Sequence, residues 1–315
     1  MSPVPAADRR VLALPGCTLF ELDGPVGRLA LHQRSEGDTQ PPAPPADAPV
    51  VLLVHSINAA ACAAEMRPLF ERLTPHCRVY ALDLPGYGAS DRPARVYDIP
   101  TFVNAIGAAV DALGTMHCGQ GVHLVALSLS CEFAARYARN RPDRVSSLCL
   151  ISPTGLDRRS DALRGLEGST REVPGMLAIL ALPLLRDALF AALVSRPSMR
   201  YFLRRTWGSR QIDDDLLQAC WQSAHQPDAV HAPLSFLSGK LFARDIRAVY
   251  ESLQCPVWMA HGTRGDFRDY SGAQWTRSRD HWQTEVFEAG ALPHFEHPDR
   301  FARSYLRFLA SRRDA

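Results

Sequence analysis

The sequence predicts an α/β protein with a doubly wound, mostly parallel sheet and an inserted helical cap. Short apolar runs, continuous at residues 50–54 and interrupted only by His123 at residues 122–127, alternate with helix-like segments. Runs of this kind are typical of strands that a parallel sheet buries on both faces. After residue 155 the alternation stops, and a long helix-like segment with five prolines follows before strand-like sequence returns. This interruption predicts the cap.

Composition excludes several classes of protein. The 315 residues are 46% hydrophobic and 22% charged, with a net charge of +2. A large globular core is therefore expected, and nothing points to a nucleic-acid partner. The first ten residues include two arginines with no apolar run after them, so we expect no secretory signal. The eight cysteines show no CxxC pair and no metal-like spacing with histidine, which predicts a reduced, cytoplasmic protein without a metal site.

Strand-like and helix-like segments alternate through the first half of the chain. We expect strands at residues 11–14, 27–32, 50–54, 78–84, 122–127 and 145–151, and helices at residues 63–73, 101–113 and 131–139. Five prolines between residues 36 and 49 predict a loop, because proline fixes φ and removes a backbone donor. The end of the chain is expected to hold strands at residues 256–260 and 285–287 and a closing amphipathic helix at residues 298–312.

The interruption divides the chain into a core of residues 1–155 and 248–315 and a cap of residues 156–247. Within the cap, residues 176–194 are rich in Leu and Ala, but Pro183, Arg186 and Asp187 interrupt them. A helix that spans a membrane needs about 20 uninterrupted apolar residues. We therefore expect a lid helix or a core helix here, and no stable membrane insertion.

Ser128 stands at the junction between a predicted strand and a predicted helix. Its neighbours two places away on each side, Ala126 and Ser130, are small. This layout is typical of a nucleophile elbow, a sharp turn that lifts a serine hydroxyl above the sheet and needs small neighbours around its strained backbone. The usual pattern has glycine at both neighbouring positions. We predict that Ser128 is a nucleophile, and a helix-capping serine is the alternative.

Four further motifs accompany the elbow. They begin at His55, Asp83, His261 and Gly290 and read HSIN, DLPGYGAS, HGTRGD and GALPHFEHP. In this order the five motifs resemble the α/β-hydrolase superfamily, of the cap-bearing type that includes bacterial esterases and carbon–carbon bond hydrolases. The resemblance covers residues 50–309. It implies a catalytic serine, a histidine base, an orienting acid and an oxyanion hole.

The resemblance assigns Ser128 the role of nucleophile and gives the backbone N–H of Leu129 one half of the oxyanion hole. The second donor comes from the loop after the strand at residues 50–54, where relatives usually read His-Gly-x. This chain has Ser56 in the place of that glycine. The second donor is therefore the backbone N–H of Ser56 or of Ile57.

The acid is displaced from its usual place. Relatives usually carry it as His-Gly-x-x-Asp, whereas this chain has Gly265 there and Asp266 one position later. A loop can absorb a slip of one residue, so we favour Asp266. Asp157, just after the strand at residues 145–151, is the alternative. In the other interpretation, Asp266 and Asp269 are solvated acids of a surface loop and have no catalytic role.

The base departs most from the pattern. Relatives place the histidine directly after the glycine of the last motif, and this chain has Ala291 there. In a first interpretation His294, three residues later, takes over through a rearranged loop. In a second, the base comes from elsewhere: His297, His55, or a cap histidine, His225 or His231. In a third, the triad is broken and the protein hydrolyses nothing efficiently.

The predicted function is a cytoplasmic serine hydrolase that acts on an ester, thioester or related acyl bond of a lipophilic small molecule. Ser128 attacks, His294 relays the proton and Asp266 orients the histidine. No metal or organic cofactor is implied, and a homo-oligomer is compatible with the sequence. Two alternatives stay open. One is a binding or accessory protein that has lost its base, and the other is a non-hydrolytic, lyase- or cyclase-like enzyme in the same pocket.

Overall fold

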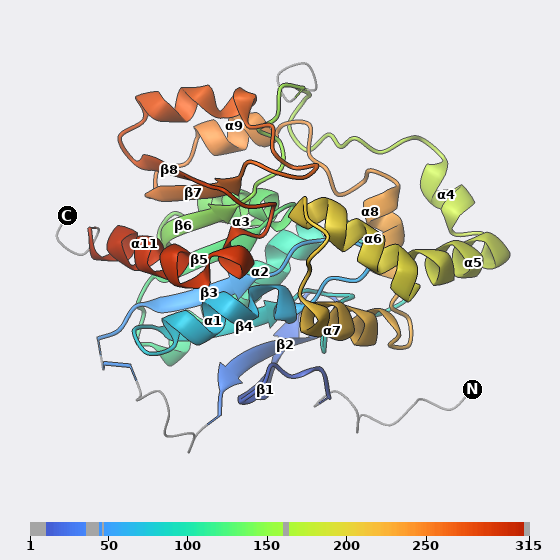
Figure 1. Ribbon diagram of the computed structural model, residues 1–315, viewed down its shortest axis with the longest axis horizontal. Coiled ribbons are helices and arrows are strands. Elements are labelled where there is room, and N and C mark those ends of the chain that lie inside the picture. Colours follow the sequence, from blue (N-terminus) through green and yellow to red (C-terminus); the bar gives the residue numbers. More distant parts are fainter. Residues whose placement is uncertain (1–10, 36–43, 46, 160–163, 312–315) are drawn as a thin grey trace.

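An eight-stranded sheet forms the centre of the molecule, with the strand order β1-β2-β4-β3-β5-β6-β7-β8 (Figure 1). The computed structural model describes residues 11–35, 44–45, 47–159 and 164–311. The strands are β1 (Cys17–Gly24), β2 (Gly27–Arg34), β3 (Val50–Val54), β4 (Arg78–Asp83), β5 (Val122–Leu127), β6 (Val145–Ile151), β7 (Val257–Gly262) and β8 (Trp282–Phe287). From β4 to β8 all neighbours are parallel, and only the β1–β2 and β2–β4 pairs are antiparallel.

Helices cover both faces of the sheet (Figure 1). On one face lie η2 (Ala63–Met66), α1 (Arg67–Leu73), α10 (Pro293–Glu296) and α11 (Pro298–Ala310). On the other face lie α2 (Ile99–Met116), α3 (Ser130–Asn140), α9 (Ile246–Glu251) and η3 (Ser271–Ser278). Between β6 and β7 the chain forms α4 (Met176–Leu180), α5 (Pro183–Leu193), α6 (Arg196–Trp207), α7 (Asp214–Ala224) and α8 (His231–Leu237).

The central strands divide their side chains between two cores. In β3, Val50, Leu52 and Val54 belong to the core that includes α2 and α3. Val51 and Leu53 belong to the core that includes α1 and α11, and all five side chains are 0% exposed. A continuous apolar run is the sequence signature of such two-sided burial. The predicted fold class is confirmed.

The N-terminal strands differ most from the sequence prediction. The strand expected at residues 11–14 is wrong, because these residues form a short helical turn and bend, and β1 begins only at Cys17. Every side chain of β1 is at least partly exposed. As an edge strand it lacks the apolar run by which inner strands are recognised. Much of the predicted loop at residues 36–49, and residue 312 of the closing helix, lie outside the described residues.

The two apolar helical stretches have different surroundings. Helix α2 is long and apolar enough to cross a membrane by length and composition, but 61% of that stretch is buried inside the fold. Its Phe102 stacks on Phe133 of α3 with the ring centroids 5.1 Å apart, so α2 is a core helix. Most of residues 176–194 form α4 and α5, which contain no buried residue, whereas Val194, directly after α5, is 3% exposed. For this second stretch the core-helix interpretation is wrong. The division into core and cap stays a prediction.

A buried carboxylate joins the end of β4 to its neighbours. Asp83 is 0% exposed and accepts hydrogen bonds from the Ala63 N–H, the Ala89 N–H and His32 Nε2, each at 2.8 Å. Burial opposes ionisation of this carboxyl. The charge and hydrogen bond of His32 outweigh the burial and hold the pKa of Asp83 well below its usual range. Strand β2, helix η2 and the loop after β4 are thereby held at one point.

We predict that Gly88→Ala destabilises the protein far more than Gly119→Ala. Both glycines have positive φ, 51° and 84°. A Cβ at Gly88 would overlap the carboxylate of Asp83, whereas a Cβ at Gly119 would meet nothing within 4 Å. Gly119→Ala should cost about 1–2 kcal/mol of backbone strain. Gly88→Ala should cost at least about 3 kcal/mol more, because it disturbs a buried charge network. Equal losses in denaturant unfolding would contradict this account.

Candidate active site

Ser128 has a left-handed backbone conformation, with φ of 57°, between the end of β5 and the start of α3. Non-glycine residues rarely adopt this region, and those that do cluster at functional sites. The Ser128 N–H donates to the Ile151 carbonyl at 2.8 Å, which fixes the turn to β6. Ala126 and Ser130 beside it are 0% exposed, while Ser128 itself is partly exposed. The strained strand-to-helix turn is present, and the catalytic role of Ser128 stays a prediction.

Ser130, at the position where the elbow pattern predicts glycine, links the elbow to the loop after β3. Its hydroxyl donates to the His55 carbonyl at 2.5 Å. Strands β3 and β5 pair Val54 with Ala126, so this loop runs beside the elbow. A glycine could not make the side-chain bond. The serine at this position therefore has a structural reason, since it holds together the two segments that would form an oxyanion hole.

The structure separates the two predicted second donors. The Ser56 N–H donates to Glu65 Oε2 at 2.7 Å, and Asn58 Nδ2 donates to Glu65 Oε1 at 3.0 Å. Glu65 is 6% exposed, so this carboxylate is a buried brace for the loop. Within the described residues, neither the Ile57 N–H nor the Leu129 N–H has a hydrogen-bond acceptor. The N–H of Ile57, rather than that of Ser56, is thus available together with that of Leu129.

His294 is packed into the core and is hydrogen-bonded away from the elbow. It is 0% exposed, and its Nε2 donates to the Glu65 carbonyl at 2.7 Å. Its ring contacts Phe295 and Phe301, and its buried Nδ1 has no partner among the described residues. Burial lowers the pKa of His294 to about 4. The structure contains no hydrogen bond between His294 and Ser128 in the part of the chain that it describes.

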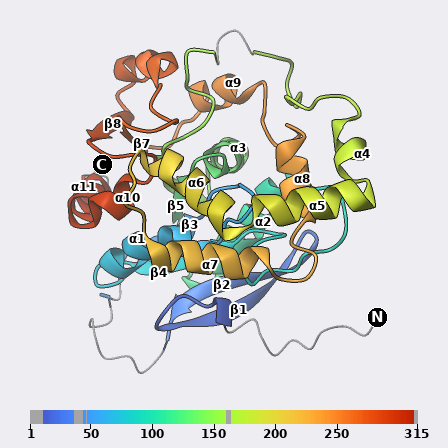
Figure 2. The ribbon, with the colours of Figure 1, turned by 45° about the vertical axis from the view of Figure 1, so that its right-hand side comes forward.

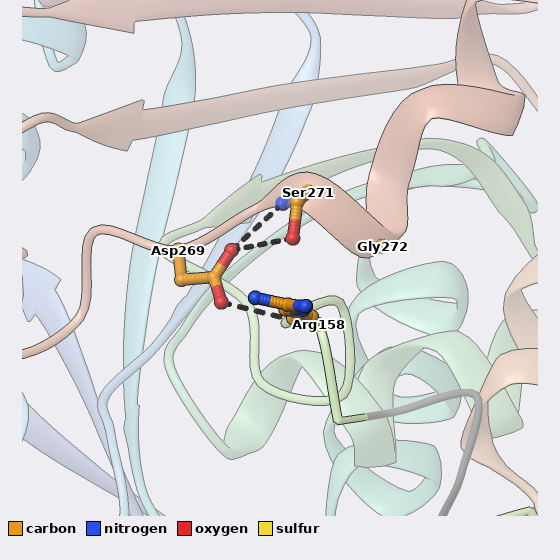
Figure 3. Close-up of a pocket in the computed structure, with 4 residues that line it drawn as sticks. All are labelled: Arg158, Asp269, Ser271 and Gly272. Atoms are coloured by element: carbon orange, nitrogen blue, oxygen red, sulfur yellow. Dashed lines mark hydrogen bonds between the residues drawn. The ribbon is translucent and has the colours of Figure 1, made fainter.

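The candidate acids lie on the surface. Asp266 pairs with Arg205 at 2.6 Å, and its side chain is 42% exposed. Asp269 accepts from the N–H and the hydroxyl of Ser271 and from the N–H of Arg158 (Figure 3). The Ser271 hydroxyl, followed by these N–H donors, lowers the pKa of Asp269. Asp157 accepts from the Arg159 N–H at 3.0 Å.

An open surface pocket of about 570 Å³ adjoins these acids. It is lined by Arg158, Asp269, Ser271 and Gly272 (Figure 3). None of the predicted triad residues lines it. This pocket therefore offers no argument about the site around Ser128.

The other histidines named from the sequence are engaged elsewhere. His55 donates from Nδ1 to the Ser56 carbonyl and accepts the Leu84 N–H at Nε2, so both of its nitrogens are occupied. His297 Nε2 contacts the Glu288 carbonyl at 3.3 Å. His225 stacks on Trp221 with the ring centroids 4.1 Å apart. His231 lies 3.8 Å from Asp228, and burial lowers the pKa of its ring.

Ala291, at the position expected for the base, is fixed beneath α6. It is 5% exposed, and its N–H donates to the Thr206 carbonyl at 2.9 Å. The preceding Gly290 donates its N–H to Glu296 Oε1 at 2.6 Å, and a Cβ there would strike the Trp207 carbonyl. The loop is therefore held closely between α6 and α10, and it carries the methyl group of Ala291 at the position where the sequence pattern led us to expect the base.

His261 is a candidate that the sequence reasoning missed. Ladder pairs join Leu127, Ile151 and Ala260 across β5, β6 and β7, so the next row holds Ser128, Ser152 and His261. The Ser152 N–H bond to the Ala260 carbonyl continues the pairing into this row. In the motif HGTRGD, the sequence pattern indicated the aspartate as the catalytic acid. The histidine of the same motif could have been found only from the register of the strands, which places it in the same row as Ser128.

The ring of His261 is oriented by two contacts. Its Nδ1–H donates to the Gly262 carbonyl at 3.0 Å, and the ring stacks on Tyr270 with the centroids 3.9 Å apart. This tautomer leaves Nε2 as the acceptor, and no described residue is hydrogen-bonded to it. Burial lowers the pKa of His261. A neutral imidazole with an unengaged nitrogen has the form that a general base requires.

Comparison with known proteins identifies the family. A family model described as the alpha/beta hydrolase family matches residues 50–304. The chain belongs to the alpha/beta hydrolase family. The resemblance inferred from the five motifs is confirmed by this match and by solved structures of the same fold.

Curated relatives match this alpha/beta hydrolase over different spans. The pimeloyl-(acyl-carrier protein) methyl ester esterase of Xanthomonas campestris pv. campestris is 28% identical over 249 residues, which are 78% of this chain and 89% of that protein. The 2-hydroxy-6-oxo-2,4-heptadienoate hydrolase of Pseudomonas putida is 29% identical over 133 residues, 41% of this chain and 47% of that protein. A haloalkane dehalogenase of Agrobacterium fabrum is 33% identical over 87 residues, 28% of this chain and 27% of that protein. These relatives support a hydrolase-type enzyme.

Solved structures share the fold of this hydrolase. A serine hydrolase involved in carbazole degradation has a TM-score of 0.69 at 16% identity, and the match covers 93% of this chain and 99% of that chain. The carboxylesterase CesB of Bacillus subtilis has a TM-score of 0.67 at 19% identity, with 97% and 96% covered. At these identities the likeness establishes the fold.

We predict that His294 contributes a pH-dependent stability. Its pKa of about 4 in the folded protein lies below the 6.5 that is usual for a histidine in an unfolded chain, so the unfolded chain binds more protons between these values. Stability is therefore full above pH 6.5 and should fall by about 2 kcal/mol between pH 7 and pH 5. His294→Gln keeps a donor for the Glu65 carbonyl and does not titrate, so it is the matched control.

Urea unfolding of both proteins at pH 7 and pH 5 measures the effect. The wild type should lose about 2 kcal/mol more than His294→Gln on acidification. If the difference in the free energy of unfolding between the wild type and His294→Gln is the same at both pH values, His294 titrates as it does in solution. That result would contradict the burial of His294 described above.

Proposed function

We propose that this hydrolase cleaves lipophilic acyl esters or thioesters, with Ser128 as the nucleophile. The observation that carries the proposal is the left-handed backbone of Ser128 at the end of β5. That conformation costs about 1–3 kcal/mol. A helix-capping serine has no need of it, because N-cap residues are extended. The strained turn therefore supports a nucleophile rather than a cap.

Two N–H groups support an oxyanion hole beside Ser128. Leu129 is the N-cap residue of α3, at the end where a helix leaves its first N–H donors unpaired. The N–H of Ile57 lies on the loop that Ser130 ties to the elbow. Donors that are fixed before the reaction stabilise the tetrahedral oxyanion without reorganisation, and each typically contributes about 100-fold or more to the rate.

The proposed base is His261, oriented by the Gly262 carbonyl instead of by a carboxylate. Its Nε2 is unengaged, and its lowered pKa keeps the ring neutral at pH 7. Adjacent strands lie about 4.8 Å apart, so the Cα atoms of Ser128 and His261 are separated by about 10 Å. Side chains directed towards each other bridge that distance directly or through one water.

In the proposed reaction Ser128 Oγ attacks the acyl carbon and His261 Nε2 takes the hydroxyl proton. The negative carbonyl oxygen accepts hydrogen bonds from Leu129 and Ile57. The tetrahedral intermediate then collapses, and the departing alkoxide or thiolate takes the proton from His261. Water, deprotonated by the same histidine, hydrolyses the acyl-serine and regenerates the hydroxyl.

Labelling with an alkyl fluorophosphonate tests the nucleophile and the base. The wild type should be labelled on Ser128, and Ser128→Ala should not be labelled. His261→Gln should slow labelling by about 100-fold or more, as expected for the loss of a general base. His294→Gln should stay within a few fold of the wild type, because the glutamine preserves the bond to the Glu65 carbonyl.

The opposite pattern would change the assignment. Slow labelling of His294→Gln with normal labelling of His261→Gln would mean that the loop carrying His294 rearranges towards Ser128. Melting temperatures of all variants separate these effects from unfolding. If the wild type is not labelled, the proposal that the protein is a serine hydrolase is contradicted.

A wild type that is not labelled would favour a second candidate function, that of a ligand-binding or non-hydrolytic protein with a hydrolase fold. The observation in its favour is that Ala291 occupies the expected base position while His294 bonds to the Glu65 carbonyl. A binding protein of this kind would take up a lipophilic acyl compound without turning it over.

We predict a preference for longer acyl chains. The support is the Xanthomonas relative, which is named as an esterase of a pimeloyl ester, an ester whose acyl group is longer than acetyl. Each methylene that enters an apolar site contributes about 0.8 kcal/mol, or roughly fourfold. The kcat/KM of p-nitrophenyl esters should therefore rise from acetate to octanoate. A decline along that series would contradict a lipophilic acyl pocket.

A further inference from the structure

Helices α4 and α5 form an apolar projection with no buried residue. We call Ile179, Leu182, Leu184 and Leu185 the apolar tip, and their side chains are 53%, 57%, 91% and 43% exposed. Figures 1 and 2 show both helices at the outer edge of the molecule, away from the sheet. Single exposed leucines are ordinary, but four large apolar side chains within seven residues mark an interaction surface.

The helix that follows is basic and aromatic. Helices α5 and α6 together contain five arginines and one aspartate. Three of these arginines pair with acids: Arg186 with Asp187, Arg200 with Asp214 and Arg205 with Asp266. Helix α6 packs against α5 and exposes Tyr201 and Phe202 by 53% and 50%. Arg196 contacts Trp221 and Gln218, and Arg204 has no acidic partner among the described residues. Exposed leucine, aromatic and arginine side chains on adjoining helices are typical of a segment that lies in the boundary of a bilayer.

We propose that α4, α5 and α6 bind reversibly to an anionic lipid surface, with the apolar tip entering the acyl boundary and Arg196 and Arg204, which have no acidic partner among the described residues, contacting headgroups. A second copy of the chain fits this surface less well. An isologous contact would bring Arg196 and Arg204 of both copies together, and like charges across an interface repel. Anionic headgroups are complementary to the same charges. The inference does not depend on the proposed hydrolysis.

The position of α6 gives this binding a consequence for the site. The Thr206 carbonyl near the end of α6 accepts the Ala291 N–H at 2.9 Å. Helix α6 therefore joins the lipid-binding surface to the loop where relatives carry their base.

Co-sedimentation of the full chain with vesicles tests the proposal. One set of vesicles is phosphatidylcholine alone, and the other contains about 30% phosphatidylglycerol. The wild type should partition to the anionic vesicles and lose binding as salt is raised, because arginine attraction is screened. Leu184→Ser should weaken partitioning by about tenfold, the effect of removing one buried leucine.

Matched controls separate the tip from general effects. Leu166 is 86% exposed but lies outside the apolar tip, so Leu166→Ser should leave partitioning unchanged. Arg204→Gln should weaken binding to anionic vesicles by about fivefold. Arg303→Gln, on the exposed side of α11, should not. Both leucines are exposed, so the serine variants should keep the wild-type melting temperature.

Three results would overturn the proposal: no partitioning to either vesicle, equal effects of Leu184→Ser and Leu166→Ser, or light scattering that shows a dimer abolished by Leu184→Ser without vesicle binding. The last result would assign the tip to self-association instead.

Discussion

The backbone of Ser128 is the constraint on which the carboxyl edge of the sheet depends. A serine with φ of 57° must be held from several sides. The Ile151 carbonyl fixes its N–H, and the Ser130 hydroxyl ties the following turn to His55. Glu65 then braces the loop after β3 through Ser56. Together these bonds bring the N–H groups of Ile57 and Leu129 to the same edge as the hydroxyl.

The segment that contains Ala291 and His294, near the end of the chain, is also fixed by hydrogen bonds and burial, but these contacts do not direct a histidine at Ser128. Ala291 is bonded to α6, and His294 fills a buried position against η2. A catalytic histidine needs one nitrogen directed at the nucleophile, and a ring with Nε2 on a carbonyl and Nδ1 in the core does not meet that need. Strand β7, two strands from the elbow, offers His261 with its tautomer already set.

Local patterns in the sequence were sufficient for the fold class and the elbow, although not for the edge strand β1. The apolar run of β5 and the small residues around Ser128 predict both the strand and the strained turn, because both depend on neighbours in the chain. The surroundings of His294 could not be predicted in this way. Its partner, the Glu65 carbonyl, is 229 residues away in sequence. The choice between Ser56 and Ile57 likewise required the position of the Glu65 side chain, and His261 required the strand register.

A crystal structure of the protein after reaction with an alkyl fluorophosphonate tests the central claim most directly. The account predicts a phosphonyl group on Ser128 Oγ, with its oxygen about 3 Å from the N–H groups of both Leu129 and Ile57. The Ser56 N–H should remain on Glu65. An adduct on another residue, or a phosphonyl oxygen that accepts no bond from Ile57, would contradict the account.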